Sequence, residues 1–156
     1  MGKEIERKFL VDQQKWDNLN KPKGNLFRQG YLLTDKDKTI RVRATETKGF
    51  LTIKGQTIGA TRMEYEYEIP VAEAVELLDN FSKSELSKIR YEIPFKNKLW
   101  EVDVFSGDNK GLTVAEIELE TEDEFFDLPD WVSIEVTEEE KYYNSNLTIN
   151  PFKDWV

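Results

Sequence analysis

The stretch Lys3-Glu4-Ile5-Glu6-Arg7-Lys8-Phe9-Leu10-Val11 near the N-terminus alternates between charged and apolar side chains. Successive side chains of an extended strand point to opposite faces, so Glu4, Glu6 and Lys8 share one face. Ile5 and Phe9 lie on the other. This period of two predicts a β-strand with one ionic face and one apolar face.

The same period recurs along most of the chain. It predicts eight strands, at residues 3–11, 25–33, 39–45, 50–54, 62–69, 86–95, 99–105 and 112–121. Seven of them carry an ionic face, and the charges on these faces are grouped by sign. Basic pairs are Arg41 with Arg43 and Lys88 with Arg90; acidic groups are Glu101 with Asp103, and Glu116 with Glu118 and Glu120.

Two arrangements are compatible with these faces. In an ordinary sheet the apolar face covers a core and the charges lie in water, which is the better interpretation of any single strand. Eight strands are also enough to close a small barrel, with the ionic faces inside and the apolar faces outside under helices. Burying so many charges is unfavourable unless opposite charges, metal ions or a polyanionic ligand neutralise them. The second arrangement is therefore also a binding hypothesis.

Three segments are predicted to be helical, at residues 12–19, 70–81 and 137–147. Pro70 suits the first turn of the second helix. In the third, Thr137 and Glu140 have the spacing of a capping box, in which each side chain bonds the other residue's backbone. We expect that helix to end before Pro151.

Composition excludes several kinds of chemistry. The 156 residues have the size of one domain, 1–156, and include no cysteine and no histidine. This excludes disulfides, thiolate or histidine metal sites and a serine–histidine–aspartate triad. Carboxylates, lysines, tyrosines and metal-bound water remain as candidate acids, bases and ligands.

The charge distribution bears on partners and location. The net charge of −9 argues against nucleic acid or an anionic membrane as a partner. Residues 1–98 carry +4 and residues 99–156 carry −13, which favours an anion site from one part and a cation site from the other. There is no apolar run of about 18 residues and the N-terminus is charged, so we expect a cytoplasmic protein.

Several motifs resemble those of the CYTH family, the triphosphate tunnel metalloenzymes. The first is E-x-E-x-K at residues 4–8. It is followed in family order by TIRVR (39–43), LTIKG (51–55), R-x-E-x-E (62–66), SKIRY (87–91), WEVDVFSG (100–107), GLTVAEIELE (111–120) and WVSIEVT (131–137). The resemblance covers nearly the whole chain.

This resemblance implies a mainly β fold, an eight-stranded antiparallel closed barrel open as a tunnel, with a few flanking helices. Basic residues would bind a triphosphate: Lys8, Arg41, Arg43, Lys54, Arg62, Lys88 and Arg90. Carboxylates would hold magnesium or manganese: Glu4, Glu6, Asp103, Glu116, Glu118 and Glu120. Arg62 and Glu120 fit the pattern less well. Lys8, Glu4 and Glu6 would act in catalysis.

The expected activity is hydrolysis of a small triphosphate, first of all inorganic tripolyphosphate, to diphosphate and phosphate. A thiamine or nucleoside triphosphatase and a class IV adenylyl cyclase are alternatives, although cyclases of the family carry a histidine-containing motif that this chain lacks. A polyphosphate-binding module would not need the acidic set. An interaction domain would use exposed aromatics such as Phe125, Phe126 and Trp131. A homodimer is left open.

The third predicted helix suggests control of access. In the family this helix packs at one end of the tunnel, which makes Tyr142, Tyr143 and Tyr31 candidates for a gate. Ordinary packing of the helix on the barrel is the equal alternative.

Overall fold

The computed structural model describes residues 2–155, and it is mainly an antiparallel β structure. The strands are β1 (Glu4–Val11), β2 (Asn25–Asp35), β3 (Lys38–Ala44), β4 (Gly49–Gly55), β5 (Thr61–Arg62), β6 (Glu64–Ile69), β7 (Ser84–Phe95), β8 (Lys98–Phe105), β9 (Thr113–Glu118) and β10 (Val132–Glu135). The α-helices are α1 (Gln13–Asn18), α2 (Val71–Phe81) and α3 (Asn144–Ile149), and short 3-10 helices span Gly107–Asn109, Glu140–Tyr142 and Phe152–Asp154.

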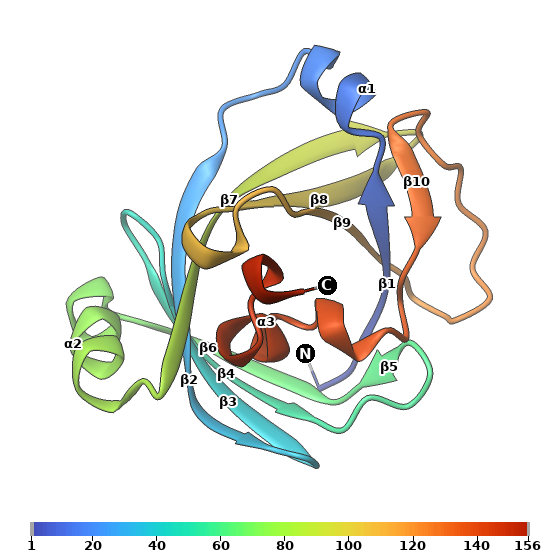
Figure 1. Ribbon diagram of the computed structural model, residues 1–156. Helices are drawn as coiled ribbons and strands as arrows, with labels where there is room; N and C mark the ends of the chain where they lie inside the picture. The colour runs from blue at the N-terminus through green and yellow to red at the C-terminus, as the bar shows by residue number, and fades with distance from the viewer. Residues whose placement is uncertain (1, 156) are drawn as a thin grey trace.

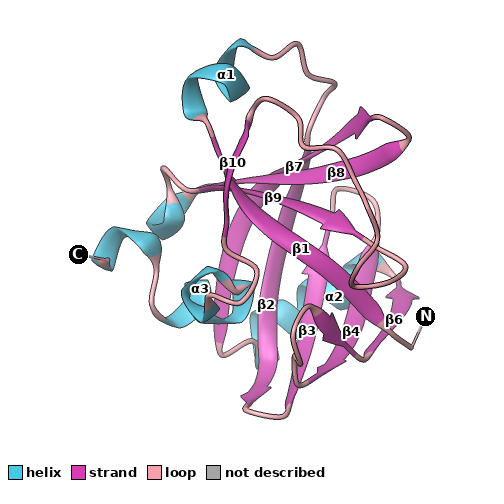
Figure 2. Cartoon of the chain, turned by 90° about the vertical axis from the view of Figure 1, so that its right-hand side faces the viewer, coloured by secondary structure: helices cyan, strands magenta, loops and turns pink. Residues whose placement is uncertain are grey.

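The strands surround a central space. They pair in the order β10-β1-β9-β8-β7-β2-β3-β4-β6, and the pairings are antiparallel. Figure 1 looks into the space that the strands surround, with α3 and the C-terminal segment across it. The side view in Figure 2 places α3 at one end of that space.

The expected closure into an eight-stranded barrel is not confirmed. Hydrogen bonding follows an open path that ends at β10 and β6, and β6 does not pair with β1 in the part of the chain that the structure describes. The predicted strand 62–69 is interrupted at Met63. Of its two parts, only the two-residue β5 pairs with β1, with Arg62 opposite Glu4. The other end of β1 pairs with β10, a strand that the sequence pattern did not predict.

The predicted helix 137–147 is wrong in its start and in its cap. Residues 140–142 form a 3-10 turn, Tyr143 is extended, and α3 begins at Asn144. Thr137 does not cap a helix, because its hydroxyl accepts a hydrogen bond from the backbone N–H of Lys8 at 3.0 Å and donates to Glu135. The bond to β1 thus replaces the capping box.

The apolar faces of the strands point outward, as the barrel interpretation requires. Phe9, Trp100 and Ile117 form a core that Trp16 of α1 and the buried Trp131 cover. A second outer core packs α2 on β3 and β4. A third cluster, in which Tyr142 and Leu147 pack on β7, β8 and β9, lies on the ionic face instead, because Phe105 of this cluster is the direct partner of Lys88. The ionic faces therefore point toward the space between the strands.

The close approach of α2 depends on Gly49 in β4. A Cβ atom added there would lie 2.6 Å from the Cβ of Ala74 in α2. Of the three aromatics named for an interaction surface, only Phe125 is exposed; Phe126 packs edge-on against Phe9 and Trp100, and Trp131 is buried. Within residues 2–155, no helix has the length and apolarity needed to cross a membrane.

Candidate active site

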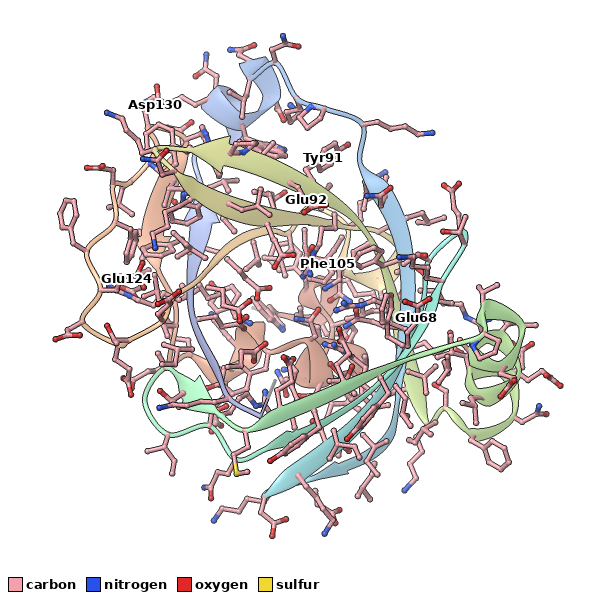
Figure 3. The ribbon with its side chains drawn as sticks, turned by 180° about the vertical axis from the view of Figure 1, so that it is seen from behind. Glu68, Tyr91, Glu92, Phe105, Glu124 and Asp130 are labelled. Carbon is pink, nitrogen blue, oxygen red and sulfur yellow. The ribbon has the colours of Figure 1, made fainter. Side chains whose placement is uncertain are left out.

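A cavity of about 210 Å³ lies between the ionic faces of the strands. Figure 3, seen from behind, shows polar side chains from many strands filling this central space. The predicted site residues that line it are Glu4, Glu6, Lys8, Arg41, Arg43, Lys54, Arg62, Lys88, Arg90, Glu116 and Glu118. The structure therefore brings together residues from β1, β3, β4, β5, β7 and β9.

Cross-strand register places the carboxylates beside one another. Glu6 of β1 is the direct partner of Glu118 of β9, and Glu116 of β9 is the direct partner of Glu101 of β8. Lys8 also lies opposite Glu116. Because partners on adjacent strands are about 5 Å apart, these three strands present a continuous group of carboxylates. We call Glu4, Glu6, Glu116 and Glu118 the acidic side of the cavity.

Charges on the acidic side strongly perturb one another. Burial, together with the negative charges of Glu116 and Glu4, raises the pKa of Glu6 well above its usual range. Burial also raises the pKa of Glu118, with a contribution from Glu4. Glu116 behaves in the opposite way: burial opposes its ionisation, but Lys8 and Arg90 hold its pKa well below the usual value. A bound cation would relieve the repulsion on this side.

Asp103 anchors the basic residues of β7. Lys88 Nζ donates to Asp103 Oδ2 at 2.7 Å, and Arg90 donates through Nε and Nη2 to both carboxylate oxygens at 2.7 and 2.9 Å. Burial opposes its ionisation, yet Arg90 and Lys88 lower the pKa of Asp103 to about 2. Asp103 lies behind the cavity lining, so in this structure it positions cations instead of facing a ligand.

Arg41, Arg43, Lys88 and Arg90 form what we call the cationic side. Burial and the neighbouring guanidinium groups of Arg41 and Arg90 lower the pKa of Arg43 to about 9. Burial lowers the pKa of Lys88 to about 7 despite Asp103. Both shifts mean that burial and mutual repulsion disfavour the charged forms of these side chains, a cost that a bound anion would offset.

Arg41 provides the clearest sign of an incomplete site. Its Nη2 donates to Thr52 Oγ1 at 3.2 Å and to Glu66 Oε2 at 3.4 Å. Its Nε is buried and has no hydrogen-bond partner among the residues that the structure describes. A buried N–H group without an acceptor is costly, so this donor is suited to an anionic ligand.

Three further cations are partly engaged by the protein. Lys54 donates to both oxygens of Glu4, at 3.1 and 3.3 Å. Arg62 donates twice to the backbone carbonyl of Gly55. The Nζ of Lys8 lies 5.6 Å from the ring centre of Tyr143, and, although burial opposes it, the carboxylates Glu116 and Glu6 raise its pKa. Lys8 is therefore a firmly charged ammonium.

Besides Asp103, a second predicted site residue does not line the cavity. Glu120 lies beyond the end of β9 at Glu118, is exposed, and has its backbone N–H bonded to Glu124 at 2.7 Å. The alternation of residues 112–121 predicted otherwise, because alternation does not show where a strand stops. The backbone N–H of Leu119 still bonds Ile5, but the next residue turns away.

Sequence reasoning missed several residues of the cavity. Glu64 and Glu66 of β6 line it, and so does Glu101 of β8. Alternation could have identified them, because Glu64 and Glu66 fall on the same strand face as Arg62, and Glu101 falls on the same face as Asp103. Thr39, Asn144 and Ser145 were missed too. Tyr31 and Tyr143, two of the three residues named above as candidates for a gate, also line the cavity. For Asn144 and Ser145 no periodic signal exists, because they lie at the start of a short helix.

Fold and cavity together describe an antiparallel β protein with an internal site whose cations and carboxylates are sorted by sign. The chain belongs to the CYTH domain family, whose model matches residues 2–149. It is 51% identical over 156 residues to an inorganic triphosphatase of Acetivibrio thermocellus, with 99% of each chain covered.

Two further similarities agree with this family. The chain is 36% identical to an inorganic triphosphatase of Nitrosomonas europaea, covering 94% of this chain and 97% of that protein. A crystal structure of an inorganic triphosphatase is similar in fold, with a TM-score of 0.64, 33% identity and 94% of each chain covered.

Proposed function

We propose that this chain hydrolyses inorganic tripolyphosphate to diphosphate and phosphate within a tunnel formed by its strands. The relatives named inorganic triphosphatase support the reaction. The cavity supports the substrate class, because it is small and its lining is charged. The observation that carries the proposal is the buried Nε of Arg41, a donor without an acceptor among residues 2–155, beside a cavity that gathers four cations on one side.

The cationic side would bind the phosphate chain. Guanidinium groups offer forked donors to phosphate oxygens, and lysine adds a compact charge. The Nε donor of Arg41 lacks an acceptor among the described residues, and the positive charges of Arg43 and Lys88 repel those of their neighbours. An anion with several negative charges would remove both costs at once. The alternative interpretation, solvated strand charges, does not fit side chains that are this deeply buried.

The acidic side fits a divalent metal in its donor chemistry. Carboxylate oxygens are the ligands that magnesium and manganese prefer, and Glu4, Glu6, Glu116 and Glu118 would hold the ion. Burial and the neighbouring carboxylates Glu116 and Glu4 raise the pKa of Glu6, and a bound cation would offset both effects. Within residues 2–155 no three carboxylates converge on one point, so phosphate oxygens and water would complete the coordination. When bound, such an ion would neutralise phosphate charge and lower the pKa of water.

The protein's own residues then have separate tasks in the reaction. Oxygen of the attacking water forms a bond to the terminal phosphorus while the anhydride P–O bond breaks, and diphosphate leaves. Glu4 and Glu6 would orient this water and take up its proton. Lys8, held as an ammonium by Glu116 and Glu6, would stabilise the charge on the phosphoryl oxygens in the transition state.

Phosphate release tests the proposal directly. Purified protein stripped of metal is assayed with tripolyphosphate, ATP and thiamine triphosphate, each with magnesium, with manganese and with EDTA. We expect release from tripolyphosphate to be fastest and to require metal. Full turnover in EDTA contradicts the metal requirement, and conversion of ATP to a cyclic nucleotide would establish the cyclase alternative instead.

A further inference from the structure

Asn144, the first residue of α3, reaches into the cavity from outside the strands. Its Oδ1 accepts a hydrogen bond from Lys88 Nζ at 3.0 Å and another from Gln29 Nε2 at 3.3 Å. Gln29 is fully buried, and its Oε1 accepts from Arg43 Nε at 3.1 Å. A single amide oxygen therefore connects two residues of the cationic side, one directly and one through Gln29.

These contacts fix the orientation of the Asn144 amide. The opposite orientation would place its NH2 group against the ammonium of Lys88, where donor meets donor. With Oδ1 occupied by Lys88 and Gln29, the NH2 group makes no hydrogen bond to any residue from 2 to 155 in the structure. Because Asn144 lines the cavity, these two N–H donors are placed to bind a ligand there.

Helix α3 is held firmly enough to position such a donor. Leu147 is fully buried, and its carbonyl accepts from the side chain of Asn109 at 3.2 Å. Thr148 accepts from the hydroxyl of Ser84 in β7 at 2.7 Å. Asn144 itself adds the bond to Lys88, also in β7. The helix is thus fixed to the strand that carries Lys88 and Arg90.

We propose that Asn144 is a neutral ligand of the substrate: its NH2 group donates to a phosphate oxygen while its carbonyl oxygen positions Lys88 and, through Gln29, Arg43. This inference rests on the proposed function and adds a residue from α3 to the binding site. A neutral donor is well suited here, because another cation would add to the burial and the repulsion that already lower the pKa of Arg43.

The test measures binding of tripolyphosphate in EDTA by isothermal titration calorimetry, without turnover. Asn144→Asp keeps the size and the acceptor for Lys88 but replaces the donors with a carboxylate oxygen. Asn144→Ala removes the donors, and with them the acceptor of Lys88 and Gln29, without adding charge. A hydrogen bond to a charged group contributes about 1.5–3 kcal/mol, so we expect Kd to rise at least about tenfold for both variants.

Asn146→Asp is the matched control, since Asn146 lies on the same helix but bonds the backbone carbonyl of Lys141 and does not line the cavity. We expect its Kd to stay within twofold. Thermal unfolding separates folding from binding. In Asn144→Asp the new carboxylate pairs with the ammonium of Lys88, so this variant should lose no stability.

Wild-type affinity in the Ala variant would overturn the inference, even if the Asp variant binds weakly, because repulsion alone would then explain the Asp result. The wild type is assayed for phosphate release in parallel with magnesium. A protein that binds tripolyphosphate through Asn144 without cleaving it contradicts the proposed function and leaves this inference standing. No binding by the wild type overturns this inference, and the absence of phosphate release with magnesium as well overturns the proposed function.

Discussion

Lys88 and Asp103 form an ion pair in which both residues are fully buried, with Nζ and Oδ2 2.7 Å apart on the adjacent strands β7 and β8. Arg90, the direct cross-strand partner of Asp103, completes the group with two further hydrogen bonds. Asp103 thus compensates Lys88 and shares Arg90 with Glu101, to which Arg90 Nη1 donates at 3.3 Å. The position of the cationic side therefore depends on Asp103.

Replacing Asp103 with Asn should destabilise the protein strongly. Removing one member of a buried ion pair leaves an uncompensated charge and costs about 3–5 kcal/mol of unfolding free energy. Urea unfolding of the variant and the wild type measures the loss. Tripolyphosphate should recover part of it, because the anion compensates Lys88 and Arg90. Asp108→Asn, which breaks an exposed pair with Lys153, should change stability by about 1 kcal/mol or less.

Replacing Lys8 with Met should abolish most turnover. The substitution keeps the buried stem and removes the ammonium opposite Glu116. Loss of one group that stabilises transition-state charge reduces kcat by about 10²–10³-fold. Steady-state phosphate release gives kcat, and circular dichroism confirms folding. The exposed Lys110→Met should behave as the wild type. Near-normal kcat in folded Lys8→Met would place Lys8 outside the reaction.

A polyanion should stabilise the folded protein specifically. A ligand that binds only the folded state raises the melting temperature by mass action. In EDTA, millimolar tripolyphosphate should raise it well beyond sulfate at matched ionic strength, because the chain of three phosphates reaches several cations of the cavity. Differential scanning fluorimetry gives both shifts. Equal shifts would mean that the basic side chains respond only to ionic strength.

The pair of Arg7 and Glu135 predicts a dependence of stability on pH. Hydrogen bonds from Arg7 lower the pKa of Glu135, and the Arg7 Nε–Glu135 Oε2 distance is 2.7 Å. Because the pKa of Glu135 is lower in the folded protein than its value of about 4.3 in the unfolded chain, the pair stabilises the fold at pH above about 4.3. This contribution is lost as the pH falls through the pKa of the folded protein.

The wild type should therefore exceed Glu135→Gln in unfolding free energy at pH 6, and the difference should shrink below about pH 4. Denaturant unfolding across this range measures it. Glu92→Gln, at an exposed position of β7, serves as the reference. A difference that persists unchanged at low pH would show that packing, and not the charge of Glu135, holds β10 to β1.

Local patterning alone accounts for most of the strands and for the sign of their ionic faces, although it did not predict β10. Alternation is a local property: in residues 3–11 it places Glu4, Glu6 and Lys8 on one face whatever the strand pairs with. The same alternation predicts the outer core, since it places Phe9 and Trp100 on the face opposite the charged residues. The predicted segments 12–19 and 70–81 correspond closely to α1 and α2, for the same local reason.

Long-range pairing set the features that no single segment contains. Thr137 bonds β1 instead of capping a helix, β9 ends before Glu120, and only β5 joins the start of β1 to the other edge of the sheet. Asn144 acquires its place from Lys88 and Gln29, which are more than fifty residues away in the chain. No local pattern encodes such contacts, because each depends on the free energy of bringing distant strands together, and the cavity exists only once they have met.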